Sequence, residues 1–284
     1  MVRYSRKGCR TEYRCIRGYR GRRMKLLIVR PEGERQTSGA PGVLWLHGGG
    51  YLLGFPEMVF LSRAADLVRQ GGAVIVSPAY SLSLRNPYPA ALSDCFHGLM
   101  YMKNHARELG IRDDQLMVGG ESAGGGLAAA LCLYVRDRKC AQIAFQMPLY
   151  PMLDCQDTPS SRNNYERIWN TRRNHLAWRL YLRSLRKRKA GIPKYASPAC
   201  CRYYGELPPA YSFVFEREPF FWETRSYVEN LRRAGVEARL DIYPGGYHAF
   251  DMMEPDSEIS RKAAKNFVAA FRYAREHYFA EQNQ

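Results

Sequence analysis

The sequence lacks a long hydrophobic run. No window of the 284 residues approaches the roughly 20 apolar residues that a helix needs to cross a bilayer, although the apolar fraction of 46% is ordinary for a globular protein. Residues 1–30 are basic but contain no apolar block of the kind found in secretory signal peptides. These absences predict a cytoplasmic protein with no membrane span, in which residues 1–284 form a single domain.

Cysteine spacing of the metal-binding type is also missing. The eight cysteines include no C-x-x-C pair, and no histidine follows them at a spacing typical of zinc sites. Several of the cysteines lie in apolar strand or helix patterns, and most are predicted to be buried thiols in a reducing compartment. The sequence therefore predicts no metal site.

Acidic residues are scarce relative to basic ones. The chain has 27 Asp and Glu against 43 Lys and Arg, a net charge of +16. Residues 1–35 carry 12 basic against 3 acidic residues and residues 162–194 carry 11 against 1, so the rest of the chain is net −3. A solvated arginine-rich face is the commoner reason for such runs, and a surface for an acidic partner is the alternative. We expect no specific nucleic-acid partner, and any non-specific retention on DNA should disappear at modest salt.

Strand-like and helix-like segments alternate along the chain. Apolar runs predict strands at residues 42–46, 73–78, 115–118, 143–150, 210–215 and 238–243. Helical patterns fall between or after them at residues 57–70, 90–109, 125–135, 222–234 and 260–278. The alternation predicts an α/β fold with a mostly parallel central sheet and helices on both faces. A hairpin over 15–20 and 24–29 is expected at the sheet edge, and residues 155–205 break the alternation as a small inserted helical cap.

The central motif of the chain is Gly120-Glu121-Ser122-Ala123-Gly124. This G-x-S-x-G run joins a predicted strand to a predicted helix, which is the arrangement of a nucleophile elbow. Glycines flank Ser122 at this spacing because so sharp a turn leaves no room for a side chain. A plain Gly/Ser turn would give the same letters. A loose dinucleotide-binding pattern over residues 124–129 is set aside, because no acidic residue ends a second strand about twenty residues later.

A base and a carboxylate for Ser122 are expected at the ends of other predicted strands, where functional groups of a parallel sheet collect. A serine hydroxyl becomes a nucleophile when an imidazole takes its proton, and His248 lies in a Gly-rich loop after the strand at 238–243. A carboxylate must then orient the imidazole. Glu218 is the predicted acid, with Glu216 and Asp241 as the alternatives.

A glycine loop follows the strand at 42–46. Residues 47–50 are His-Gly-Gly-Gly, and three glycines allow backbone N–H groups to approach a ligand without hindrance from side chains. The order serine, acid, histidine is that of α/β-hydrolases. The N–H groups of Gly49, Gly50 and Ala123 are therefore the predicted oxyanion hole.

Together these motifs resemble the hormone-sensitive-lipase-like family of carboxylesterases. The resemblance rests on residues 47–51 (HGGGY), 120–125 (GESAGG) and 243–251 (YPGGYHAFD), and it extends from about residue 24 to the C-terminus. It implies the α/β-hydrolase fold, no cofactor, and hydrolysis of short-chain acyl esters through an acyl-enzyme. It also suggests a homodimer.

The sequence departs from the family in two places. Glu218-Pro219 stands where the family usually has Asp-Pro, and the N-terminal cap helices common in the family are missing or short. The acyl pocket is therefore expected to be built mostly from residues 155–205, with Trp169, Tyr181 and Phe220 as lining residues. The same motifs fit an amide-cleaving enzyme of the acylaminoacyl peptidase or arylformamidase type. A non-catalytic ligand-binding member of the fold is a third hypothesis.

Overall fold

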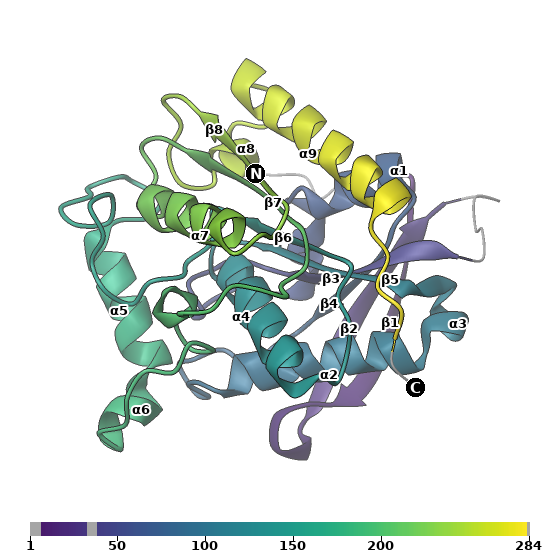
Figure 1. Cartoon of the computed structure of the whole chain (residues 1–284), viewed down its shortest axis with the longest axis horizontal. Helices are drawn as coiled ribbons and strands as arrows, with labels where there is room; N and C mark the ends of the chain where they lie inside the picture. Colours follow the sequence, from purple (N-terminus) through teal and green to yellow (C-terminus); the bar gives the residue numbers. More distant parts are fainter. Residues whose placement is uncertain (1–6, 33–38, 283–284) are drawn as a thin grey trace.

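The computed structural model describes residues 7–32 and 39–282, which form an eight-stranded sheet in the order β1-β2-β4-β3-β5-β6-β7-β8 (Figure 1). The strands from β3 onward pair in parallel, whereas β1 and β2 pair antiparallel and join β4 as an antiparallel edge. The strands are β1 (Cys9–Arg17), β2 (Arg23–Pro31), β3 (Ala40–Leu46), β4 (Val74–Pro78), β5 (Ile111–Glu121), β6 (Phe145–Leu149), β7 (Ala210–Phe215) and β8 (Ala238–Tyr243).

Helices cover both faces of this sheet. One buried cluster contains the inner sides of α1 and α9, and the other contains those of α2, α4, α5 and α7. In Figure 1 the sheet runs between α9 above it and α2 and α4 below it. The helices are α1 (Ala64–Gly71), α2 (Ala90–Asn104), α3 (Ala106–Leu109), α4 (Ala123–Arg138), α5 (Thr171–Tyr181), α6 (Arg183–Lys187), α7 (Phe221–Arg233), α8 (Phe250–Met253) and α9 (Glu258–His277).

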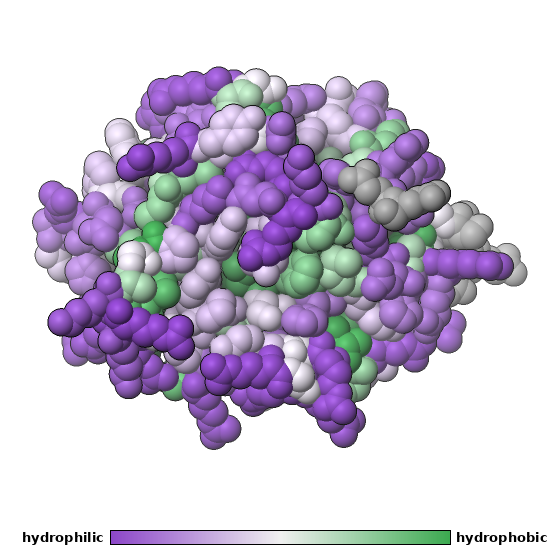
Figure 2. Space-filling view, turned by 60° about the horizontal axis from the view of Figure 1, so that its bottom comes forward, coloured by the Kyte–Doolittle hydropathy of each residue, from purple (hydrophilic) through white to green (hydrophobic). Residues whose placement is uncertain are grey.

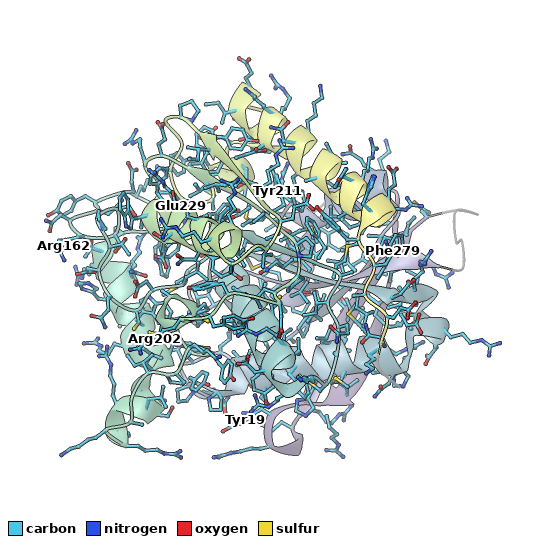
Figure 3. All side chains as sticks on the ribbon, in the orientation of Figure 1. Tyr19, Arg162, Arg202, Tyr211, Glu229 and Phe279 are labelled. Atoms are coloured by element: carbon cyan, nitrogen blue, oxygen red, sulfur yellow. The ribbon has the colours of Figure 1, made fainter. Side chains whose placement is uncertain are left out.

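Packing in each layer follows from the sequence. The central strands β3, β4 and β6 are buried along their whole length, which explains why they read as continuous apolar runs. Helix α4 is rich in Gly and Ala and is buried over most of its length. On the opposite face Tyr211 of β7, labelled in Figure 3, lies 6.0 Å from the ring of Phe267 in α9.

The predicted fold class is confirmed, and several element boundaries are corrected. The helix predicted over 57–70 is a 3-10 turn, Pro56–Phe60, followed by the shorter α1. The long helix predicted over 90–109 breaks at His105, whose φ of −121° is non-helical, into α2 and α3. Residues 19–21 form a 3-10 turn rather than the end of a strand.

The insertion lies between β6 and β7. Residues 155–205 contain α5, α6 and a 3-10 turn, Pro198–Cys200, and Asn170 caps α5 by accepting a hydrogen bond from the N–H of Arg173. In Figure 1 the two helices lie at one end of the molecule, beside α7. None of the helices in the described ranges is both long and apolar enough to cross a membrane. All eight cysteines are free thiols.

Candidate active site

The turn between β5 and α4 carries Ser122. Its backbone has φ 57° and ψ −121°, a conformation that residues with a side chain rarely adopt. This strain is expected of a nucleophile elbow. A Cβ atom at Gly120 or at Gly124 would stand 2.4 Å or 1.9 Å from the carbonyl oxygen of Leu46. Glycine is therefore required at both positions, and the turn presents the hydroxyl of Ser122 at the N-terminal end of α4.

A hydrogen-bonded relay of three side chains starts at this hydroxyl. The Oγ atom of Ser122 lies 3.0 Å from Nε2 of His248, and Nδ1 of His248 lies 2.8 Å from Oε1 of Glu218. Ser122 and His248 are each 4% exposed, and Glu218 is fully buried. The relay joins the ends of β5, β7 and β8, so its members meet only because these strands run in parallel.

The alternative carboxylates lie elsewhere. Glu216 is exposed in the turn after β7. Asp241, in the middle of β8, accepts a hydrogen bond from the hydroxyl of Tyr211 and forms an ion pair with Arg239. Of the three candidates named from the sequence, the structure brings Glu218 to His248.

Burial and the imidazole act on Glu218 in opposite directions. Desolvation raises the pKa of the Glu218 carboxyl, whereas the facing imidazole of His248 lowers it by charge and by hydrogen bonding. The second oxygen, Oε2, has no hydrogen-bond partner in the described part of the chain. The facing imidazole therefore offsets part of the cost of burying a charged carboxylate at this position.

The glycine loop after β3 approaches the same point. Gly49 has φ 115° and Gly50 has φ 60°, and a Cβ atom at Gly49 would stand 2.3 Å from the carbonyl oxygen of Leu53. Within residues 7–32 and 39–282, no hydrogen bond uses the N–H groups of Gly49, Gly50 or Ala123. These three donors remain available to an anion, and that of Ala123 also lies at the positive end of the α4 dipole.

Glu121 holds the glycine loop in place. This residue of the G-x-S-x-G run is 2% exposed; its Oε2 accepts a hydrogen bond from Nε1 of Trp45 at 2.7 Å and its Oε1 accepts one from the N–H of Gly48 at 3.3 Å. Burial raises the pKa of the Glu121 carboxyl to about 8. No role for Glu121 was predicted from the sequence, although its position beside Ser122 in the motif is a signal that it lies near the site.

A second buried group supports the loop that carries His248. Asp251 is fully buried; its Oδ1 accepts a hydrogen bond from the hydroxyl of Tyr150 at 3.1 Å, and its Oδ2 lies 3.3 Å from Nε of Arg63. The ring of Tyr150 meets the imidazole of His248 edge-on, with 5.5 Å between ring centroids. Arg63 also pairs with Asp66 at 3.2 Å. Sequence reasoning missed these residues because nothing in the sequence shows that Arg63 faces Asp251.

Of the three lining residues predicted from the sequence, Trp169 alone keeps accessible surface at the relay. Its indole lies over Gly50, where a Cβ atom would stand 2.2 Å from Cη2, and its ring centroid is 6.1 Å from that of His248. Phe220 is fully buried with its ring 5.1 Å from His248, so it supports the imidazole rather than a substrate. Tyr181 is 1% exposed and stacks on Tyr51 at 4.0 Å, so it packs the cap onto the core, and its lining role stays a prediction.

The described ranges contain no group of three or more His, Cys, Asp or Glu side chains placed to hold a metal ion. His47, which begins the glycine loop, is buried and stacks on Tyr80 at 4.1 Å. Burial lowers the pKa of its imidazole to about 4, so His47 is neutral at physiological pH. The ring of His47 therefore has a packing role directly after the end of β3.

Several proteins to which this chain is similar carry esterase names. A family model for the alpha/beta hydrolase fold matches residues 43–252. The chain is 31% identical to an AB hydrolase superfamily protein of Schizosaccharomyces pombe over 86% of this chain and 74% of that protein, and 31% identical to carboxylesterase NlhH of Mycobacterium tuberculosis over 74% and 66%. The solved structure of bacterial heroin esterase superimposes with a TM-score of 0.86 at 30% identity, over 95% of this chain and 86% of that one. The chain belongs to the α/β-hydrolase fold family, in the hormone-sensitive-lipase-like group that its motifs resemble.

Proposed function

We propose that this protein is a carboxylesterase that hydrolyses short-chain esters through an acyl-enzyme intermediate. One observation carries the proposal, namely the unbroken relay from Ser122 Oγ to His248 Nε2 at 3.0 Å and from His248 Nδ1 to Glu218 Oε1 at 2.8 Å. A chain that only bound a ligand would have no need of a serine on a strained turn with both a base and a carboxylate behind it.

Acylation begins with proton transfer from the hydroxyl of Ser122 to Nε2 of His248 as the oxygen attacks the ester carbonyl. The carbonyl oxygen becomes negative and accepts hydrogen bonds from the free N–H groups of Gly49, Gly50 and Ala123. Glu218 stabilises the imidazolium through Nδ1–H. His248 then returns the proton to the leaving alcohol, and the acyl group stays on Ser122.

Deacylation repeats these steps with water. His248 takes a proton from a water molecule that attacks the acyl carbonyl, the same three N–H groups hold the oxyanion, and the proton passes to Ser122 as the acid leaves. Ser122 and His248 end the cycle in their starting protonation states, because the alcohol leaves with the proton of Ser122 and the attacking water supplies its replacement.

The preference for short acyl chains is supported by the position of Trp169. Its indole stands directly over Gly50, in the loop that supplies two of the proposed oxyanion donors. An acyl chain bound there must pass this rigid ring, which restricts the volume beside the carbonyl carbon. Replacing Trp169 with alanine should therefore extend activity toward longer acyl chains.

Nitrophenyl esters from acetyl to dodecanoyl, compared with an acetyl aryl amide, test the proposal. We expect turnover to be fastest with acetyl or butyryl and slow with the amide. Ser122→Ala should lower kcat by roughly a million-fold, as loss of the nucleophile does in other serine hydrolases. Ser93→Ala, a half-buried serine in α2, is the matched control and should leave kcat unchanged.

Two outcomes would contradict this function. No turnover of any ester by the folded protein would end the esterase proposal. Faster cleavage of the amide than of the acetyl ester would replace it with the amide-hydrolase alternative, which uses the same oxyanion chemistry.

A further inference from the structure

One part of each basic segment, residues 17–23 and residues 183–189, lies at the same end of the molecule. The turn between β1 and β2 and the start of α6 both contact the loop at residues 81–88. Nη1 of Arg22 donates a hydrogen bond to Oδ1 of Asn86 at 2.7 Å, and Nη2 of Arg183 donates to the carbonyl oxygen of Leu84 at 3.4 Å. We call residues 17–23, 81–88 and 183–189 the basic end.

The basic end contains no carboxylate. Its three segments hold neither Asp nor Glu, and they carry ten basic side chains. Nine of the ten are exposed, and Arg183 is half-buried. The ten are Arg17, Arg20, Arg22, Arg23, Arg85, Arg183, Arg186, Lys187, Arg188 and Lys189.

Nearby carboxylates do not neutralise these charges. Asp94 lies beneath the basic end but is 3% exposed, and its two oxygens accept hydrogen bonds from the N–H groups of Tyr19 at 2.6 Å and Ser81 at 2.8 Å. Asp94 therefore links the turn between β1 and β2 to the loop at residues 81–88 through these two hydrogen bonds. Among the described residues, none of the ten basic side chains forms an ion pair.

Several exposed arginines elsewhere on the molecule form ion pairs. Arg112 pairs with Asp114 at 2.6 Å, Arg225 with Glu229 at 2.8 Å, and Arg239 with Asp241 at 3.0 Å. Other exposed cations, such as Arg172 and Lys262, also form no ion pair with the described residues, so the basic end is distinguished by holding ten cations together with no Asp or Glu in its three segments. Ten like charges held together by the fold repel one another, and an external anion would relieve that repulsion.

An apolar residue lies in the middle of the basic end. Leu84 is 55% exposed and, with Arg22, Arg23 and Arg85, lines a hollow of about 360 Å³ between the hairpin and the loop. Asp94 also lines this hollow, and its two oxygens are occupied by the N–H groups of Tyr19 and Ser81. Arginines around a hollow of this kind suit a phosphate group, which they can bind through paired N–H donors. The exposed leucine beside them suits a hydrocarbon environment.

The basic end also projects from the body of the molecule. In Figure 1 the hairpin turn and α6 are the two parts that reach lowest, and in Figure 3 long side chains extend beyond the ribbon at this end, near the labelled Tyr19. Figure 2, which brings this end forward, shows hydrophilic side chains along its lower margin with small hydrophobic patches between them. Two projecting tips with a loop between them fit a broad, flat partner.

We propose that the basic end docks on an anionic membrane surface, with phospholipid head groups at the arginines and Leu84 dipping into the interface. Basic side chains and an exposed apolar residue in one patch are the composition of peripheral membrane contacts. A protein surface that binds single-stranded nucleic acid would instead offer exposed aromatic rings on which bases stack. At the basic end Tyr19 and Tyr88 are half-buried. This proposal is independent of the hydrolytic activity.

Sedimentation of the full-length protein with vesicles tests the docking surface. We expect binding to vesicles of phosphatidylcholine with about one third phosphatidylserine, and no binding to phosphatidylcholine alone. The double variant Arg20→Gln/Lys187→Gln should bind the anionic vesicles about 25-fold more weakly, at roughly five-fold for each charge removed near the surface. Leu84→Asn should weaken binding several-fold and leave its salt dependence unchanged.

The matched control is Lys262→Gln/Lys265→Gln, which removes two exposed charges from α9 without touching the basic end. It should leave vesicle binding within about two-fold. Absence of binding to the anionic vesicles, equal binding to both kinds of vesicle, or an equal loss in the control variant would overturn the proposal. So would tighter binding to an RNA oligonucleotide than to the anionic vesicles at the same salt, with Leu84→Asn having no effect. Hydrolysis of dissolved nitrophenyl acetate should be the same for all these variants.

Discussion

The candidate active site and the basic end handle charge in opposite ways. At the site the carboxyl groups of Glu218 and Asp251 are buried, and each accepts a hydrogen bond from a fixed donor. At the basic end ten cations stand together without a carboxylate among them. Buried charge must be matched within the protein because water cannot solvate it, whereas exposed charge is screened and can remain unmatched. The properties of the candidate active site therefore depend on the exact positions of single side chains, and those of the basic end depend on its total positive charge.

Among the changes that test this comparison, the largest expected effect comes from removing the charge of Glu218. Glu218→Gln keeps the shape of the side chain but no longer stabilises an imidazolium, so kcat for nitrophenyl acetate should fall by roughly ten-thousand-fold. Glu216→Gln is the matched control, since this exposed residue lies two positions earlier. Equal activity of Glu218→Gln and the native protein, or a large loss in Glu216→Gln, would show that the relay is misassigned.

Asp251 tests whether the support behind His248 depends on a matched charge. Asp251→Asn leaves the partly buried Arg63, whose side chain is 12% exposed, with Asp66 alone, and we expect the free energy of unfolding to fall by about 3 kcal/mol. Activity should also fall, mainly through kcat, because His248 loses its fixed position. Denaturant unfolding and ester kinetics measure the two effects. Asp66→Asn, which removes the partly exposed partner of the same arginine, should cost less than half as much; equal losses would contradict a special role for Asp251.

Glu121 gives the site a pH dependence in stability. Its pKa is raised from 4.5 to about 8, so the folded protein holds this proton more tightly than the unfolded chain does. The stabilisation of the folded protein by this proton is complete below pH 4.5 and is lost as the pH rises through about 8. The melting temperature should therefore decline across that interval.

In Glu121→Gln this decline should be smaller. The absolute melting temperature should also be lower, because the amide NH₂ must face one of two N–H donors. An unchanged pH profile in the variant would assign the decline to another group. Thermal unfolding followed by circular dichroism at pH 4.5, 6, 7 and 8 makes the measurement.

The smallest expected effect lies at the basic end. Arg20→Gln/Lys187→Gln should change the free energy of unfolding by less than about 0.5 kcal/mol, because exposed charges without ion pairs add little to stability. Urea denaturation of this variant and of Lys262→Gln/Lys265→Gln should give the same midpoint. A large loss in the first variant alone would mean that the basic end is structural and would remove the contrast between the two regions.

Much of the fold was predictable because its signals are local. The alternation of apolar runs and helical patterns is written residue by residue, and the predicted α/β sheet is confirmed. Boundaries were less predictable, as the break at His105 shows: helical spacing continues through residue 109, but the backbone at His105 leaves the helix. The cap shows a further limit. Tyr181 has the same aromatic character as Trp169, yet it faces the core and Trp169 faces Gly50.

The catalytic roles proposed for Ser122, His248 and Glu218 stay predictions. Part of the geometry of these residues follows from the sequence, and part follows only from the tertiary structure. The sequence by itself determined the strained turn at Ser122, because Gly120 and Gly124 are fixed by contacts within a few residues and with one neighbouring strand. Only the tertiary structure decided that Glu218 rather than Glu216 meets His248, that Arg63 lies against Asp251, and that parts of the two basic segments share one end. These outcomes depend on how distant strands and loops pack, and such packing leaves no local pattern in the chain.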